Sequence, residues 1–359
     1  MSLKSERDEL KDLLAWAIRI ELSTIPPYAT AAYTLHQEGQ YDRNQPQQVN
    51  AESLEVIRQV MVEEMLHMTL AANILNALGG DVYLGPGDMP GPVKAPRLPV
   101  YPGHILPSGK GPKVHLRKFS KPQIHAFREI ERAPANFDKV KDGDCYAAET
   151  IGGFYHCVKK KLEALCDKYP SKEIFVGDPV LQIGPEHYWG AGGEVFRVTG
   201  ERSALKAIAM IVEEGEGADL GGRAGDGDPI PGIDEEDVAH FFKFNEILLS
   251  TYYCADDKVG EPPTGGELWV DWTAVFPMRD DPKAGSYRAK PEVHAKMNAF
   301  NALYTQLIDG LNAAFNGDQD RFRALAPLMM ELRYAAQALV RVPVNEKGET
   351  AGPSWTYQS

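Results

Sequence analysis

The sequence predicts an all-α protein, a helical bundle with long irregular insertions and extra helices near its C-terminus. Several stretches repeat apolar residues every three or four positions, as helices with one buried face do. Few stretches show the alternation typical of strands, so packed helices are expected to form the core. Long segments rich in proline and glycine show neither pattern, and they predict ordered loops over the bundle.

The composition is that of a globular protein with a sizeable core. The chain has 359 residues, of which 43% are hydrophobic and 25% charged. Its net charge of −13 argues against nucleic acid as a partner. The sequence contains no apolar run of about 18 residues, so no membrane span is expected. The charged N-terminal stretch predicts no signal peptide.

The spacing of the four cysteines fits neither a zinc site nor a dense disulfide framework. They are therefore expected to be reduced thiols, which predicts a cytoplasmic protein. These residues are Cys145, Cys157, Cys166 and Cys254.

Two long helices are expected in the N-terminal part of the chain. Helical periodicity covers residues 3–25, and Pro26 and Pro27 are expected to stop or kink that helix. A second strong pattern covers residues 51–78 and ends at the glycines that follow it.

The middle of the chain predicts a long loop and shorter elements. Residues 81–118 are expected to form an ordered loop, followed by a short helix at 121–132 that Ser120 caps. Residues 144–168 predict the third bundle helix. Alternating pieces within residues 172–198 suggest a small hairpin.

The C-terminal half predicts more helices, separated by irregular segments. Thr199 is expected to cap a fourth helix that ends near Gly215. A loop at 217–232 precedes a helix expected at 234–253. The remainder predicts an irregular segment and two helices, at residues 255–290, 291–315 and 318–341.

Two regions follow from this order of elements. Residues 1–260 are expected to form the metal-binding bundle, with the loop insertion at 81–120. Residues 261–359 are expected to form a helical extension packed on that bundle.

The first candidate site residue is a carboxylate on an apolar stripe. Glu21 continues the stripe of Leu10, Leu14 and Ala17, so it is expected to point inward. A buried carboxylate is costly unless a cation or hydrogen bonds compensate it. The alternative is a partly exposed glutamate paired with Arg19 or another base.

The second helix carries a carboxylate and an imidazole on its inner face. Glu64 and His67 lie three residues apart and therefore share that face, whereas Glu63 is expected to lie outside, in solvent. A Glu-x-x-His pair on a bundle helix is typical of di-iron and di-manganese carboxylate proteins. The alternative is a core histidine that a nearby acid satisfies.

Two later segments add candidates of the same chemical types. Glu213 and Glu216 continue the expected buried stripe of the fourth helix, whereas Glu214 is expected to point elsewhere. The alternative is a solvated acidic helix end, which the helix dipole mildly disfavours. His240 lies on the apolar stripe of the next helix. A lone histidine on such a face is often structural.

Together these side chains predict a mixed nitrogen and oxygen ligand set for a transition metal. Iron fits best, as one or two ions, with Mn or Cu as alternatives. The predicted metal ligands are Glu21, Glu64, His67, Glu213, Glu216 and His240.

Several segments of the chain, taken in order, are similar to one known family. They are Ile20–Tyr28, Glu63–His67, Thr150–Tyr155, Ile211–Gly217, His240–Phe244 and the tail Ala351–Trp355. The chain resembles the ferritin-like family of the iminophenyl-pyruvate dimer synthase type. The resemblance implies a ferritin-like bundle with a non-haem metal centre. It also implies oxidative coupling of two imino acids derived from an aromatic amino acid, a reaction of secondary metabolism.

The chain departs from that family at one position of the third bundle helix. Gly153 stands where the family usually has a glutamate. Glu149, one turn earlier, and His156, three residues later, are candidates to reach the same site. If neither does, the centre holds one ion, a different metal or none.

The expected function is that of a metal-dependent oxidoreductase using O₂ or a peroxide. Tyr28, Tyr155 and His156 are the candidates to donate protons or to support the ligands. A metal-binding protein without turnover and a scaffold with a degenerate site are the alternatives. The expected partner is an aromatic small-molecule substrate, together with a second copy of the chain or a partner oxidase.

Overall fold

The computed structural model describes residues 2–36, 50–133, 144–189, 192–216, 224–229, 236–258 and 260–358. Its helices are α1 Leu3–Tyr33, α2 Ala51–Ala77, α3 Lys121–Ile130, α4 Ile151–Lys168, α5 Ser171–Ile174, α6 Glu201–Glu216, α7 His240–Leu249, α8 Pro291–Phe315, α9 Asp320–Ala324 and α10 Ala326–Leu339. The 3₁₀ turns are η2 Cys145–Ala147, η3 Pro179–Leu181, η4 Pro185–His187 and η5 Ala284–Tyr287. The strands β1 Gly225–Pro229 and β2 Glu236–Val238 pair antiparallel.

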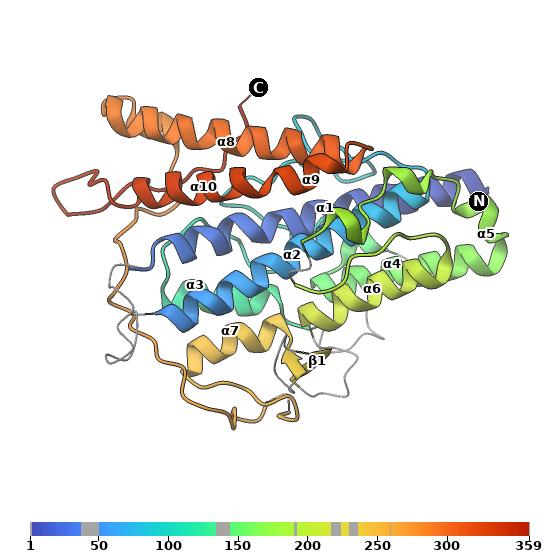
Figure 1. The fold of residues 1–359 in the computed structure, drawn as a ribbon, viewed down its shortest axis with the longest axis horizontal. Coiled ribbons are helices and arrows are strands. Elements are labelled where there is room, and N and C mark those ends of the chain that lie inside the picture. The colour runs from blue at the N-terminus through green and yellow to red at the C-terminus, as the bar shows by residue number, and fades with distance from the viewer. Residues whose placement is uncertain are drawn as a thin grey trace.

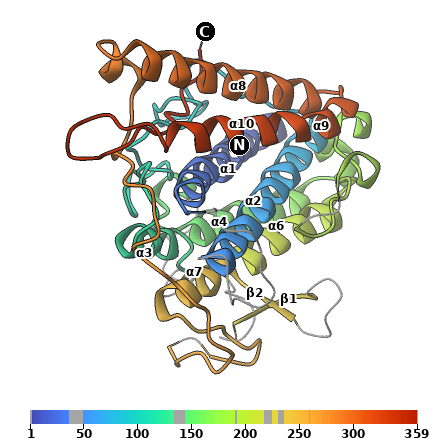
Figure 2. The same cartoon turned by 60° about the vertical axis from the view of Figure 1, so that its left-hand side comes forward.

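The helices form two layers on either side of the α1–α2 pair (Figure 1). On one side lie α3, α4, α6 and α7, and on the other lie α8, α9 and α10. Figure 2 shows the small β1–β2 ribbon beside α7, at the edge of the bundle. The predicted all-α bundle with irregular insertions is thereby confirmed. No helix of the described residues is long and apolar enough to cross a membrane.

Helix α1 continues through Pro26 and Pro27, so the prediction that it ends or kinks at about residue 25 is wrong in its end point. Each proline removes one N–H from the helix and leaves a carbonyl four residues earlier without its usual donor. For Pro27 that carbonyl belongs to Ser23, and the Tyr101 hydroxyl donates to it at 2.8 Å. The loop that follows α2 thus compensates the helix for a lost hydrogen bond.

The long loop at 81–118 is ordered and packs on the bundle, as predicted. The Arg19 side chain, 5% exposed, donates to Pro96 O at 2.9 Å and to Ile105 O at 3.0 Å. Arg19 therefore holds the loop against α1, and it is not the base that pairs with Glu21.

Two helix starts differ from the predictions. Ser120 precedes α3, but its side chain makes no capping hydrogen bond, and Pro122 lies in the first turn instead. Helix α4 begins at Ile151 and not at 144, because the Thr150 side chain accepts a hydrogen bond from Gly153 N at 3.0 Å and caps the helix there.

The segment at 172–198 holds no strand among its described residues, so the predicted hairpin is wrong there. Short helical turns, α5, η3 and η4, take its place. Asn73 of α2 fixes this segment, because its side chain donates to Ile183 O and Phe196 O, both at 2.9 Å. Val195 and Val198 lie in an irregular stretch, and the Gln182 side chain, instead of a neighbouring strand, pairs with the Val198 backbone.

The fourth bundle helix and its continuation also differ in their ends. Thr199 does not cap α6. Instead the Ser203 hydroxyl accepts from Thr199 N and Gly200 N, at 2.9 and 3.2 Å. The predicted loop contains β1, and the next helix starts at His240 and not at 234, because residues 236–238 pair with β1. Much of 217–232 lies outside the described residues.

The C-terminal helices agree with the predicted ranges, except that Leu325 divides the last one into α9 and α10. The side chain of Leu325 is 6% exposed and packs toward Gly310 of α8. A Cβ at Gly310 would lie 2.4 Å from a methyl carbon of Leu325, so a larger residue there would displace the end of the Leu325 side chain.

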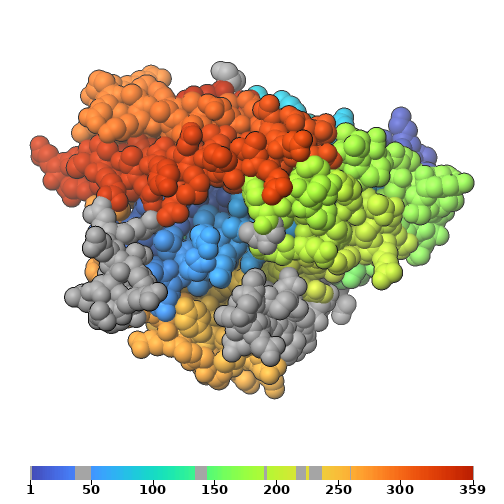
Figure 3. Space-filling view, in the orientation of Figure 1, coloured from blue at the N-terminus to red at the C-terminus, as the bar shows by residue number. Residues whose placement is uncertain are grey.

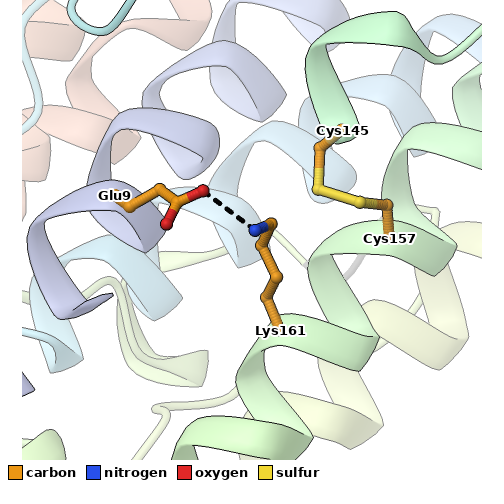
Figure 4. Close-up of a disulfide and its surroundings, with 4 residues drawn as sticks. All are labelled: Glu9, Cys145, Cys157 and Lys161. Carbon is orange, nitrogen blue, oxygen red and sulfur yellow. Dashed lines mark hydrogen bonds and ion pairs between the residues drawn. A yellow bond between two sulfur atoms is a disulfide. The ribbon is translucent and has the colours of Figure 1, made fainter. Parts of the chain in front are cut away.

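Two cysteines form a disulfide, which corrects the expectation of four reduced thiols. Cys145 of η2 and Cys157 of α4 are joined, with Cα atoms 5.4 Å apart (Figure 4). In the same region Lys161 pairs with Glu9 at 2.9 Å and ties α4 to α1. The cysteine-based argument for a reducing compartment therefore does not hold, and the cytoplasmic location stays a prediction.

Candidate metal centre

A cluster of polar side chains lies inside the bundle, between α1, α2, the end of α3, α6 and α7. Each of them is at most 8% exposed. The cluster consists of Glu21, Glu63, Glu64, His67, Glu131, Glu214, His240 and Lys243. Buried ionisable groups at this density are expected to be held by one another or by a cation.

The centre of the cluster is formed by two imidazoles and three carboxylates. Ligand atoms of Glu64, His67 and His240 all lie within 4.8 Å of one another. Glu64 Oε1 is 3.1 Å and Glu131 Oε2 is 3.8 Å from His240 Nδ1. Glu21 Oε2 is 3.9 Å from His67 Nδ1. The two rings stack with their centroids 5.4 Å apart.

Each imidazole is oriented by a carboxylate on its outer side. His67 Nε2 lies 2.7 Å from Glu214 Oε2, and His240 Nε2 lies 2.8 Å from Glu63 Oε2. If Nε2–H donates to the outer carboxylate, the Nδ1 lone pair faces the centre, as it does in carboxylate–histidine–metal arrangements. His240 Nδ1 is buried and makes no hydrogen bond of normal geometry, although Glu64 lies nearby. This is the arrangement expected of a ring nitrogen that faces a cation.

Lys243 fixes the outer carboxylate of His240. Its ammonium group donates to both oxygens of Glu63 at 2.8 Å and lies 3.0 Å from Asp237. Burial raises the pKa of Glu63, but Lys243 and His240 outweigh that effect and hold this pKa well below its ordinary value. The prediction that Glu63 is solvated is wrong, because α7 covers that side of α2.

Three hydroxyl groups support the inner carboxylates. Tyr28 donates to Glu131 Oε1, and Tyr155 donates to Glu21 Oε1. The Thr24 hydroxyl lies 3.0 Å from Glu64 Oε2. The two predicted tyrosines therefore contact the predicted ligands directly, each through its hydroxyl group.

In this cluster, burial disfavours the ionised form of the carboxyl groups. Burial and the charge of Glu64 raise the pKa of Glu21 and of Glu131. Burial would also raise the pKa of Glu64, but contacts with His240 and the charge of His67 lower it. Burial lowers the pKa of His240, yet its carboxylate contacts outweigh burial and raise that pKa well above its usual value.

The donor set fits a transition-metal ion. Among the described residues, five buried carboxylates surround two imidazoles and one lysine, and that lysine is shared with Asp237. Even with both imidazoles protonated, the cluster would carry an excess of negative charge if its acids were ionised. Carboxylate oxygens and imidazole nitrogens are the ligands that Fe and Mn accept together. A divalent ion here would neutralise acids that otherwise must hold protons.

Glu131 was missed by the sequence analysis, although a signal for it exists. Ile124, Phe127 and Glu131 follow helical spacing, and both apolar residues are fully buried. The rule that selected Glu21 therefore also selects Glu131.

Other predicted residues take different positions. Glu213 is half-buried, and Glu214 takes the inward position instead, because α6 buries the stripe of Ala204, Ile208 and Ile211. The side chain of Glu216 lies outside the described part of the chain.

Neither residue predicted to replace the acid missing at Gly153 is among the buried side chains of the cluster. Glu149 is exposed and pairs with Lys110 at 2.5 Å. His156 is half-buried and follows Tyr155 on α4, so its side chain leaves the helix about 100° away from that tyrosine. The end of α3, and not α4, thus provides the additional acid, as Glu131.

A small cavity of about 10 Å³ adjoins the inner carboxylates. It is lined by Glu21, Glu64, His67 and Glu131, and by the backbone near Gly152 and Gly215. A space of this size accommodates about one water molecule. An aromatic substrate does not fit into it in this conformation.

The fold and the cluster define a helical-bundle protein with a buried carboxylate–histidine centre. The ferritin-like family model matches residues 14–249, and the chain belongs to the ferritin-like family. That match does not separate the iminophenyl-pyruvate dimer synthase type from other members.

The comparison with solved structures agrees on the fold. The crystal structure of a ferritin-like protein from Caulobacter vibrioides is similar, with a TM-score of 0.55 and 20% identity. The similarity covers 97% of each chain. No curated protein matches the sequence.

Proposed function

We propose that this protein is a metal-dependent oxidoreductase whose centre holds one or two iron ions. The observation that carries the proposal is the excess of buried carboxylates around two imidazoles whose Nδ1 atoms face them. Retaining such acids in an apolar interior is costly without a cation. When bound, the metal would activate O₂ or a peroxide, or polarise a substrate.

The side chains suggest two neighbouring ligand groups. His240, Glu64 and Glu131 form one group, and His67 and Glu21 form the other. Glu64 lies close to both imidazoles, so it would hold an ion in either group. In this proposal Glu131 takes the role of the acid that Gly153 replaces, so the departure from the family does not by itself remove the second ion.

The protein's own groups can hold protons beside the centre. The Tyr28 and Tyr155 hydroxyls each donate to an inner carboxylate oxygen, and burial raises the pKa of both phenols well above the usual range. These hydroxyls therefore stay protonated at neutral pH. They orient Glu131 and Glu21, and they can pass a proton to these carboxylates.

The substrate class rests on the family resemblance alone. It suggests an imino acid derived from an aromatic amino acid as the molecule that is oxidised or coupled. Such a molecule would need a wider opening than the cavity of about 10 Å³. This small cavity favours a second candidate function, metal binding without turnover.

Metal analysis of the protein purified without chelators tests the metal centre. We expect bound iron and anomalous scattering between His67 and His240. We expect Glu64→Gln to lose most of this metal, whereas the exposed control Glu149→Gln should retain it. Less than about half an equivalent of metal per chain, even after reconstitution with Fe, Mn or Cu, would refute the centre.

Oxygen consumption by the loaded protein with aromatic imino acids then separates the two candidates. Turnover that Glu64→Gln abolishes supports the oxidoreductase. Stable metal binding without turnover supports the second candidate.

A further inference from the structure

A large cavity lies on the other side of the α1–α2 pair from the metal centre. It measures about 670 Å³ and is enclosed by α1 and α2 on one side and by α8, α9 and α10 on the other. Figure 3 shows the hollow between α10, in red, and α2, in blue. None of the eight side chains of the metal cluster lines this cavity. It is therefore a separate feature of the molecule.

The walls of the cavity are apolar and adaptable. Five of the ten methionines of the chain line it: Met61, Met65, Met68, Met329 and Met330. Methionine side chains are flexible and polarizable, so they adjust to ligands of different shape. Met330 is 43% exposed although it is apolar. A concave apolar surface of this size is typical of a small-molecule site.

The shape of the cavity favours an elongated molecule. Its α1 wall extends from Leu22 to Tyr33, a length of about 16 Å at the helical rise of ~1.5 Å per residue. The α2 wall extends from Ala51 to Met68 along the same side. An extended acyl chain of medium length matches this span.

The charges of the lining favour an anionic head group. Its charged residues are Arg58, Arg333 and Glu55, which are two cations and one anion. The lining thus has a net positive charge in a chain whose net charge is −13. Charge of this sign beside an apolar groove is complementary to a carboxylate with an apolar tail.

We infer that this cavity binds an amphipathic monocarboxylate, with its alkyl chain between α2 and α10 and its carboxylate near Arg333. Arginine suits this role because its guanidinium group binds carboxylates through two parallel hydrogen bonds. The inference does not depend on the proposed metal chemistry.

Displacement of a fluorescent fatty acid tests the inference. A dansyl-labelled undecanoic acid is titrated into the full-length protein and then competed with decanoic acid, dodecanoic acid or dodecanol. Each buried methylene should tighten binding about fourfold, so dodecanoic acid should compete roughly tenfold or more better than decanoic acid. Dodecanol should compete less well than dodecanoic acid, because it lacks the charge.

Variants locate the site. Arg333→Gln should weaken dodecanoic acid about tenfold and leave dodecanol unchanged, whereas Arg321→Gln, an exposed control on α9, should change neither. Ala326→Phe should fill the cavity and abolish binding of the probe, with its helical circular dichroism unchanged. Glu64→Gln should bind the probe like the wild type, because Glu64 does not line this cavity. Loss of the metal site can therefore be told apart from loss of the fatty-acid site.

Three results would overturn the inference. They are no saturable binding of the probe, equal competition by both acids, and unchanged binding in both Arg333→Gln and Ala326→Phe. A fourth result would also overturn the inference: the probe does not bind, and the protein forms a dimer that Ala326→Phe disrupts. That result would show that a second copy of the chain covers the cavity.

Discussion

The ion pair between Lys243 and Glu63 offers the sharpest test of how the centre is held. In Lys243→Met the apolar stem is kept and the ammonium group is removed. Glu63, 8% exposed, would lose the donor that now contacts both of its oxygens at 2.8 Å, while its contact with His240 at 2.8 Å would remain. Removing one partner of a buried ion pair costs about 3–5 kcal/mol, because the other charge stays buried.

The remaining contact with His240 and protonation of Glu63 limit the loss, so we expect the lower end of this range, about 3 kcal/mol. Urea unfolding of metal-free protein measures it. Lys243→Met combined with Glu63→Gln should lose less than the sum of the single variants, by about 1–3 kcal/mol, because the double variant leaves no charge at residue 63. The exposed pair Lys296 and Glu292 provides a matched control, for which Lys296→Met should cost less than about 1 kcal/mol.

The same variant reports on metal binding. Without Lys243, Glu63 holds the His240 ring less firmly, and the metal affinity should fall about 10- to 100-fold. A chelator competition assay measures the change. The reasoning would be refuted if Lys243→Met matched the wild type in both unfolding free energy and metal affinity, or if the two substitutions were strictly additive.

Three further predictions concern the rest of the fold. Burial raises the pKa of Glu246 from its ordinary 4.5 to about 8, so the unfolded chain loses a proton that the folded one keeps, and stability falls as pH rises between these values. From pH 5 to pH 7 the wild type should therefore lose about 3 kcal/mol of unfolding free energy relative to Glu246→Gln, as measured by guanidinium unfolding. A difference between the two proteins that stays constant with pH would contradict this. Replacing Cys145 and Cys157 by serine removes a crosslink between residues 12 apart in sequence and should lower the unfolding free energy by about 3 kcal/mol. A melting temperature equal to that of the oxidised wild type would argue against the disulfide. Tyr101→Phe should cost about 1–2 kcal/mol because Ser23 O loses its donor inside α1, and thermal unfolding indistinguishable from the wild type would show that this bond does not support the helix.

The sequence by itself determined the class of fold and the inner part of the site. Apolar residues at helical spacing defined the bundle helices, because a helix that buries one face must repeat that face every three or four residues. The same stripes correctly placed Glu21, Glu64, His67 and His240 inside. A polar residue on a stripe is visible without knowing which helix lies opposite.

Only the tertiary structure decided which side chains surround that inner set. Glu63 is buried because α7 covers a second face of α2, and one helix's periodicity does not reveal such a neighbour. Glu214 lies against His67 because α6 packs on α2. The Tyr101 hydroxyl replaces the hydrogen bond that Pro27 removes from α1, and the disulfide depends on the packing of η2 against α4. These features arise from contacts between segments far apart in the chain. Their partners are therefore fixed only when the helices pack.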